Sequence, residues 1–289
     1  MEDYTPLDDN IFVPCNDDEP ISVSVDQVAA KLKQISVSRG GGPGNLPNWV
    51  LKTYSDILAP ALTEVSWISP LKNPRFHENG SWLMFCLCQR GNLWRINKDL
   101  RPISLTSTLS KVSEGFVIEK DLKPVLLKCI DPNQYGFITN PCTTFALILI
   151  LHHWLEATDR SGSHVRVALL DYKKAFDFVD QNLLIAKLYS IGVNPTVVNW
   201  ICDFLRNRSQ RVKLDSSRFS EFINVPASIP QGSKIGPWLF LATINDLSTT
   251  STLWKFADDT TLAEVIPKSS TSTLQWMECS NGRMKMYSA

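Results

Sequence analysis

The stretch Leu253-Trp-Lys-Phe-Ala-Asp-Asp-Thr-Thr-Leu-Ala-Glu-Val265 places two adjacent aspartates inside an otherwise apolar and β-branched segment. This pattern predicts a β-hairpin in which Asp258 and Asp259 form the two-residue connection. Two carboxylates this close, partly shielded from water by aromatic neighbours, repel one another strongly unless one is protonated or a cation lies between them. Two interpretations follow. The pair is either part of a divalent-cation site or an ordinary turn, because aspartate is also a common turn residue.

Two further segments bear on that choice. An apolar run begins at Val165 and ends abruptly at Asp171, which predicts a buried strand with a carboxylate at its end, where it can face a cleft. The segment from Ile229 to Pro237 is a glycine-bearing loop that leads into an apolar segment, 238–244, predicted to be helical. Loop backbone at the start of a helix can approach a phosphate or a sugar closely.

Five blocks then follow one another in an order typical of one family. They are DLRPISLTSTLSKV (99–112), QYGFITN (134–140), LLDYKKAFD (169–177), SIPQGSKIGPWLF (228–240) and KFADDTTL (255–262). The set resembles the reverse transcriptase of non-LTR retrotransposons, mobile elements of the LINE and jockey-like kind, from about Ser24 to the C-terminus. The resemblance implies an RNA-directed DNA polymerase, a nucleotidyltransferase that joins a deoxynucleoside triphosphate to a primer 3′-hydroxyl.

The fold implied by this resemblance is α+β, the fingers and palm of a right-hand polymerase with an antiparallel catalytic hairpin in the palm sheet. Residues 1–23 are expected to form an acidic flexible tail, 24–95 an N-terminal helical extension of the fingers, and 96–289 the fingers and palm. The family pattern stops at Ala289, so we expect a C-terminally truncated domain with the thumb absent.

The implied catalytic residues are Asp171, Asp258 and Asp259, with the carbonyl of Tyr172 as a further metal ligand. Asp171 and Asp258 can meet only if their two strands are neighbours in one sheet. Two carboxylates from adjacent strands could hold two divalent ions about 3.5 to 4 Å apart, as phosphoryl chemistry requires. Their hard oxygen ligands favour two Mg²⁺ ions, with Mn²⁺ possible.

The resemblance also implies a nucleotide site made of Arg101, Tyr172, Phe176, Gln231 and Gly232. Arg101 would contact the triphosphate, and Gln231 and Gly232 the sugar and base side. The Phe176 ring would exclude a ribose 2′-hydroxyl and so select deoxynucleotides. Without the resemblance, each of two residues also has a purely structural interpretation. Arg101 could be an ordinary surface arginine, and Phe176 could be a phenylalanine of the hydrophobic core.

Two rival functions remain open at this stage. The segment from Pro70 to Arg95 matches no family pattern, so the chain could be a catalytically inactive remnant that at most binds nucleic acid. The palm is also shared by RNA-dependent RNA polymerases, although the bulky Phe176 argues against that class.

The composition is compatible with a nucleic-acid enzyme. The chain has 289 residues, a formal net charge of zero and 44% hydrophobic residues. Residues 31–289 hold all 29 Lys and Arg but only 21 of the 29 Asp and Glu, so this part carries a net charge of +8. The expected partners are an RNA template, a DNA primer and a deoxynucleoside triphosphate. The oligomeric state stays undetermined.

The chain is expected to be intracellular, nuclear or cytoplasmic, and neither secreted nor bound to a membrane. Its longest apolar run, 145–151, is too short for a membrane span, and its N-terminus is acidic where a signal peptide would be basic. The seven cysteines are scattered without zinc-ligand spacing. A helix is predicted from Thr143 to Thr158, and because it is apolar on nearly every face we expect it to be buried.

Overall fold

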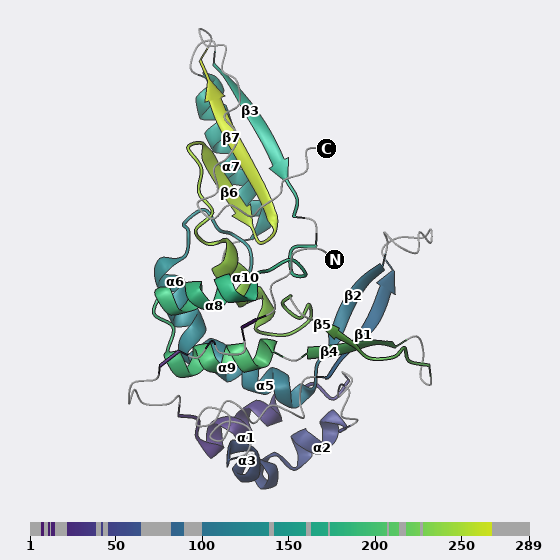
Figure 1. The fold of residues 1–289 in the computed structure, drawn as a ribbon. Coiled ribbons are helices and arrows are strands. Elements are labelled where there is room, and N and C mark those ends of the chain that lie inside the picture. Colours follow the sequence, from purple (N-terminus) through teal and green to yellow (C-terminus); the bar gives the residue numbers. More distant parts are fainter. Residues whose placement is uncertain are drawn as a thin grey trace. The chain divides into compact units, whose positions relative to one another are not determined.

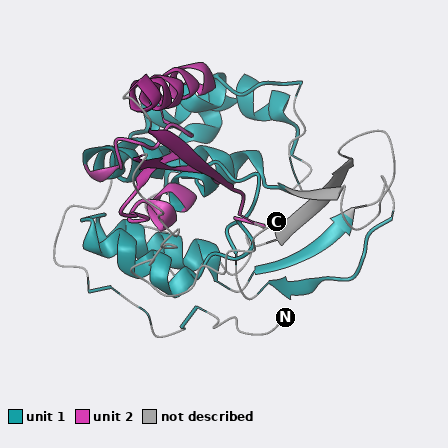
Figure 2. Cartoon of the chain, turned by 90° about the horizontal axis from the view of Figure 1, so that it is seen from above, with its two compact units in different colours: residues 1–128, 176–239 teal, residues 129–175, 240–289 magenta. Residues whose placement is uncertain are grey.

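The chain is described by a computed structural model and forms two compact units, each built from two separate stretches (Figures 1 and 2). Unit 1 comprises residues 1–128 and 176–239, and unit 2 comprises 129–175 and 240–289. The structure describes residues 7–8, 11, 13–14, 22–38, 42, 46–64, 82–89, 100–138, 142–159, 163–172, 174–206, 208–213, 218–225 and 228–267.

Unit 2 is a three-stranded antiparallel sheet with one long helix. The sheet order is β3 (His164–Leu170), β7 (Asp259–Ile266), β6 (Thr252–Phe256), and the helix is α7 (Thr143–Asp159). Strand β7 therefore pairs with both other strands. The predicted antiparallel hairpin is present, and the α+β fold class is confirmed.

The core of unit 2 lies between α7 and the sheet. Ala146 and Ile150 of the helix pack with Trp254 and Ala263 of the strands. The expectation that α7 is buried on nearly every side is wrong, because a three-stranded sheet covers one side of a helix. Its exposed apolar side chains are Phe145, Leu147, Ile148, Leu151 and Leu155.

Unit 1 consists mainly of helices. They are α1 (Val25–Lys33), α2 (Asn48–Thr53), α3 (Ser55–Thr63), α5 (Thr108–Val117), the π-helical turn η3 (Ile118–Leu122), α6 (Lys123–Cys129), α8 (Gln181–Ser190), α9 (Pro195–Leu205) and α10 (Gly236–Ile244). The last residue of α6 and the second half of α10 belong to unit 2. Local sequence sets two of the helix starts. Ser24 and Gln27 form a capping box before α1, and Asn194 caps α9 with Pro195 at its first position.

A second sheet in unit 1 has the order β2 (Leu100–Leu105), β1 (Trp82–Gln89), β4 (Arg208–Lys213), β5 (Ile223–Val225). Strand β1 pairs antiparallel with β2 and parallel with β4, and β4 pairs antiparallel with β5. Strand β1 falls inside the segment 70–95, which the sequence analysis could not assign; the rest of that segment lies outside the described residues.

Part of the predicted flexible tail is attached to unit 1. Val13 is buried, and its backbone N–H and carbonyl both bond the side-chain amide of Asn199 on α9, each at 2.9 Å. The Arg206 guanidinium donates to the carbonyls of Asp8 and Ile11. Backbone groups of these described residues are thus bonded by α9 and by the residue that follows it.

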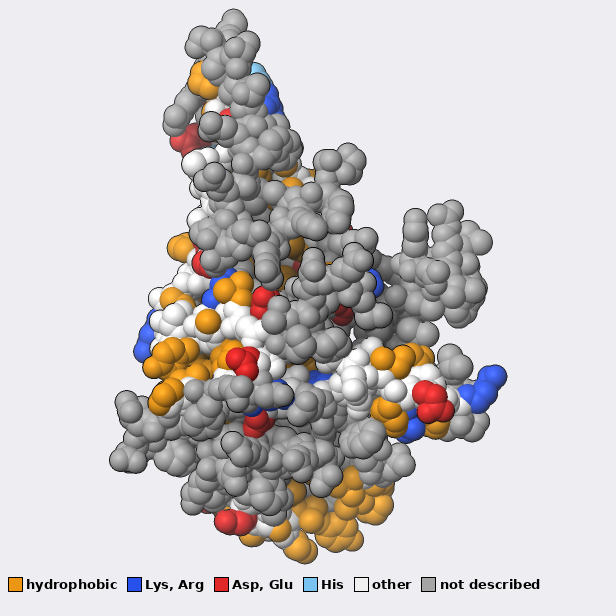
Figure 3. Space-filling model, viewed as in Figure 1, with side chains coloured by type: hydrophobic (Ala, Val, Ile, Leu, Met, Phe, Trp, Pro, Cys, Tyr) orange, Lys and Arg blue, Asp and Glu red, His pale blue; other side chains and the backbone are white. Residues whose placement is uncertain are grey.

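An apolar surface lies over α2 and the start of α3, where Leu46, Trp49, Tyr54 and Ile57 are exposed (Figure 3). Among the described helices, none is both long enough and apolar enough to cross a membrane.

Candidate catalytic site

Three aspartates lie at one end of the unit 2 sheet. The last pair between β3 and β7 joins Leu170 to Thr260. Asp171 directly follows β3, and Asp259 is the first residue of β7. The strand that ends before Asp171 is thus a neighbour of the aspartate hairpin, as the sequence analysis required.

The hairpin connection differs from the prediction by one residue. Phe256 pairs with Asp259, so the two-residue connection is Ala257-Asp258 and Asp259 already belongs to β7. Ala257 has a positive φ of 56°, a left-handed backbone that is unfavourable for residues with a Cβ atom. The shift separates the two acids: Asp258 lies in the turn, whereas Asp259 lies on the strand facing the end of β3.

The charges of the three carboxylates influence one another. Loss of hydration raises the pKa of Asp259, and the negative charges of Asp258 and Asp171 raise that pKa further. A cation placed among these groups would relieve this repulsion. Their oxygen atoms are the donor type that Mg²⁺ and Mn²⁺ prefer, so the residues fit a divalent ion in chemistry. Within the described ranges, no three carboxylate, histidine or cysteine side chains already stand close enough to share one ion.

Gln134, from the QYGF block, holds the aspartate turn. Its buried side-chain oxygen accepts the N–H groups of Gly136 at 2.8 Å and Ala257 at 3.0 Å. Gly136 lies so close to the turn that an added Cβ atom would overlap the amide nitrogen of Ala257. The QYGF block therefore supports the left-handed Ala257 and, through it, the position of Asp258.

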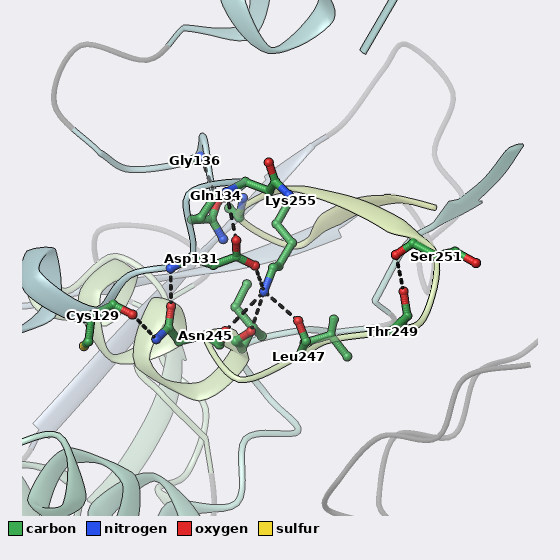
Figure 4. Close-up of polar contacts among 12 residues, drawn as sticks. Cys129, Asp131, Gln134, Gly136, Asn245, Leu247, Thr249, Ser251 and Lys255 are labelled. Carbon is green, nitrogen blue, oxygen red and sulfur yellow. Dashed lines mark hydrogen bonds and ion pairs between the residues drawn. The ribbon is translucent and has the colours of Figure 1, made fainter. Parts of the chain in front are cut away.

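Lys255 anchors the same hairpin from within the core (Figure 4). Its side chain is completely buried, and its ammonium lies 2.6 Å from a carboxylate oxygen of Asp131. The ammonium also donates to the carbonyls of Ile244, Asn245 and Leu247, the last at 2.8 Å. A buried ammonium is tolerated only when it is paired and hydrogen-bonded in this way.

The backbone reinforces this contact between the two motifs. Lys255 N–H donates to the carbonyl of Asn133, and Tyr135 N–H donates to the carbonyl of Lys255, both at 2.8 Å. The Asn245 side chain adds a bond to the N–H of Asp131 and one to the carbonyl of Cys129. The segment 129–136 is thereby fixed along β6.

The sequence analysis missed Lys255, Asp131 and Gln134 as parts of the site. The available signal was a lysine within a strand whose other residues are mostly apolar. Such a lysine needs a buried counter-charge, and an aspartate stands three residues before the QYGF glutamine.

Tyr172 lies next to Asp171 in unit 2, with a half-buried side chain. It packs against the cluster of Leu247, Leu253 and Leu262. This packing fixes the chain directly after β3, where Asp171 is exposed.

Arg101, Phe176, Gln231 and Gly232 belong to unit 1. Two backbone hydrogen bonds link the loop that carries Gln231 to the segments that carry Arg101 and Phe176. Ser104 of β2 donates its N–H to the carbonyl of Gln231 at 2.7 Å, and Ile229 donates to the carbonyl of Phe176 at 2.9 Å. Arg101 is on β2, where its backbone pairs with Cys88 of β1. Gly232 has a φ of 104°, which strongly favours glycine.

The loop before α10 corrects one expectation. Its N–H groups at Lys234 and Ile235 both donate to one carboxylate oxygen of Glu114 on α5. These two donors are therefore already satisfied by the protein. The prediction that backbone at this helix start approaches a phosphate is wrong for these two residues.

The chain is similar in sequence to known reverse transcriptases. Residues 89–281 match the family model described as "Reverse transcriptase (RNA-dependent DNA polymerase)". The chain is 25% identical over 256 residues to the probable RNA-directed DNA polymerase from transposon BS of Drosophila melanogaster, covering 85% of this chain and 27% of that protein. It is 31% identical over 167 residues to the probable RNA-directed DNA polymerase from transposon X-element of the same species, covering 55% of this chain and 18% of the relative.

A third relative is the RNA-directed DNA polymerase from mobile element jockey of Drosophila melanogaster, 30% identical over 150 residues, which are 52% of this chain and 16% of that protein. The chain spans about a quarter or less of the length of these relatives. The family model covers well over half of the chain and includes both the aspartate hairpin and the QYGF block. The chain therefore belongs to the reverse transcriptase (RNA-dependent DNA polymerase) family.

Proposed function

We propose that this chain carries the catalytic centre of an RNA-directed DNA polymerase of a non-LTR retrotransposon. The reaction joins a deoxynucleoside triphosphate to the 3′ end of a DNA primer on an RNA template. One observation carries the proposal. Asp171 directly follows β3, which pairs with β7, while Asp259 begins β7 and Asp258 lies in the adjoining turn.

In this mechanism the carboxylates of Asp171, Asp258 and Asp259, with the carbonyl of Tyr172, would hold two magnesium ions. Bound there, the ions would lower the pKa of the primer hydroxyl and neutralise charge on the triphosphate. The protein's own contribution is to keep three acidic groups together. Lys255 and Gln134 do this by fixing β6 and the turn, so the repulsion among the aspartates does not push the hairpin away from β3.

In the proposed assignment, four residues of unit 1 would bind the nucleotide: Arg101, Phe176, Gln231 and Gly232. Arg101 would grip triphosphate oxygens through its planar guanidinium. The Phe176 ring would exclude a 2′-hydroxyl, and Gln231 and Gly232 would contact sugar and base. In this assignment residues 24–95 extend the fingers, and 96–289 form fingers and palm of a right-hand polymerase.

Primer extension on an RNA template tests the proposal. The wild-type chain should extend a DNA primer with deoxynucleotides in Mg²⁺ or Mn²⁺, and Asp258→Asn should reduce the rate by at least about a hundredfold, as expected when a metal ligand is lost. Asp159→Asn, at an exposed position at the end of α7, removes the same charge and should leave the rate unchanged.

Two outcomes would contradict the proposal. Extension that survives Asp258→Asn would refute the metal assignment. A wild-type chain that binds primer–template but extends nothing in either metal would favour the inactive remnant.

A further inference from the structure

Glu114 is a buried acid that the proposed mechanism does not use. It lies on α5 and has no solvent exposure. One carboxylate oxygen accepts the N–H groups of Lys234 and Ile235, the latter at 3.0 Å, and the other accepts the Ser110 hydroxyl at 3.0 Å. A carboxylate with this many donors is held in one orientation, so the two backbone groups it binds are held as well.

Lys234 and Ile235 are the last two residues before α10. Their N–H groups are among those that a helix start leaves without partners, and the helix dipole favours a negative charge at this end. Glu114 supplies that charge from another helix. The contact thus connects α5 to the loop that carries Gln231 and Gly232, which are three and two residues before Lys234.

The loop is fixed at its other positions too. Ser104 N–H donates to the Gln231 carbonyl, and the Ser233 hydroxyl donates to the Pro230 carbonyl at 2.8 Å while accepting the Gly236 N–H at 3.1 Å. Between these contacts, the charged side chain of Glu114 bonds the loop backbone at Lys234 and Ile235.

Arg208 makes the burial of this charge tolerable. It is on β4 and almost completely buried, with its guanidinium 4.1 Å from the Phe204 ring centre and its Nε–H donating to the Phe204 carbonyl. Its positive charge favours the charged form of Glu114 and acts against the cost of removing that carboxylate from water.

We propose that Glu114 is a positioning residue for the incoming nucleotide: it holds the 231–235 loop in the conformation in which Gln231 and Gly232 line the nucleotide site. This inference rests on the proposed polymerase function. Loss of Glu114 should therefore weaken nucleotide binding. The aspartates lie in the other unit, where Lys255 and Gln134 still hold their hairpin.

Steady-state primer extension with the full chain provides the first test. Glu114→Ala should raise the KM for deoxynucleotide by roughly tenfold or more and change kcat less, since a displaced loop weakens binding before chemistry. Glu114→Gln has the same shape and keeps one acceptor oxygen, so it should recover most of the loss. The KM for primer–template should stay the same in both. Glu64→Gln, an exposed glutamate of the same unit, is the matched control.

Amide hydrogen exchange provides a second test that needs no activity. In the wild type, the N–H groups of Lys234 and Ile235 should exchange slowly; in Glu114→Ala they should exchange at least about tenfold faster, while amides of α9 stay protected. Fast exchange of both groups in the wild type would overturn the inference. A folded Glu114→Ala chain with a normal KM for nucleotide would also overturn it, and so would equal rises in the KM for nucleotide and for primer–template.

A different result would separate the inference from the proposed function. A wild-type chain that shows no polymerase activity, but whose Lys234 and Ile235 amides are protected, would refute the proposed function and still support the positioning of the loop by Glu114.

Discussion

The ammonium of Lys255 lies 2.6 Å from the carboxylate of Asp131, and the lysine side chain is completely buried. This ion pair joins the strand that leads into the aspartate turn to the segment before QYGF. The two motifs are more than 120 residues apart in the chain. Their packing is thus what places the turn, and each part of that packing can be tested separately.

Replacing Lys255 with methionine should destabilise the chain strongly. Methionine fills the space but leaves the Asp131 charge and three carbonyls without their donor. Breaking a buried ion pair by removing one partner costs about 3 to 5 kcal/mol. Urea denaturation should show this loss. Lys111→Met, at an exposed lysine of α5, should change the free energy of unfolding by no more than about 0.5 kcal/mol. A small effect of Lys255→Met would mean that the pair does not support the hairpin.

Substituting alanine for Gly136 should displace the catalytic turn. The new Cβ atom would overlap the amide of Ala257, and backbone cannot yield as a flexible side chain does. Overpacking of this kind costs about 1 to 3 kcal/mol, and the movement of Asp258 should lower the primer-extension rate. Gly192→Ala is a useful comparison, because Gly192 has a positive φ of 87° but no atom within 4 Å of the added Cβ. It should lose some stability and no activity. Equal activity of the two variants would argue against the role of Gly136.

Replacing Phe176 with alanine tests sugar selection. If the ring excludes the 2′-hydroxyl, Phe176→Ala should incorporate ribonucleotides at least about tenfold more readily relative to deoxynucleotides, because a steric clash has been removed. The measurement is the ratio of kcat/KM values for a matched ribonucleotide and deoxynucleotide pair. Phe178→Ala, at an exposed phenylalanine two residues away, should leave the ratio unchanged. An unaltered ratio in Phe176→Ala would favour a purely structural role.

Glu114 should make the stability of the chain depend on pH. Burial raises the pKa of its carboxyl above the ordinary 4.5, and this outweighs the hydrogen bonds from Ile235, Lys234 and Ser110 and the charge of Arg208, which lower it. The folded chain therefore binds this proton more tightly than the unfolded chain does. The resulting stability is complete below the unfolded pKa and is lost as the pH rises through the folded pKa.

Glu114→Gln removes this titration. The free energy of unfolding of the wild type minus that of the variant should thus fall as the pH is raised from about 4 towards 8. Urea denaturation at several pH values measures the difference, with Glu64→Gln as the reference for loss of one exposed carboxylate. A difference that rises with pH would show that the hydrogen bonds and Arg208 dominate over burial.

The sequence by itself determined the family, the fold class and the presence of the aspartate hairpin. Five motif blocks and the alternating apolar residues of 253–265 suffice for that, because they depend on local order along the chain. The position of the turn depended on more than local sequence. Asp258-Asp259 and Ala257-Asp258 are both plausible two-residue connections, and the Gln134 side chain stabilises the second by accepting the Ala257 N–H.

Tertiary structure alone decided which groups support the site. The sequence shows that Lys255 stands in a mostly apolar strand and needs a counter-charge, but only the packed fold selects Asp131, 2.6 Å away. Glu114 likewise appears as one acid in an amphipathic helix, although it binds a loop 120 residues away. Spacing along the chain predicts which residues share a strand or a helix face. Partners for buried charges come from segments distant in sequence, and only the packed fold selects them.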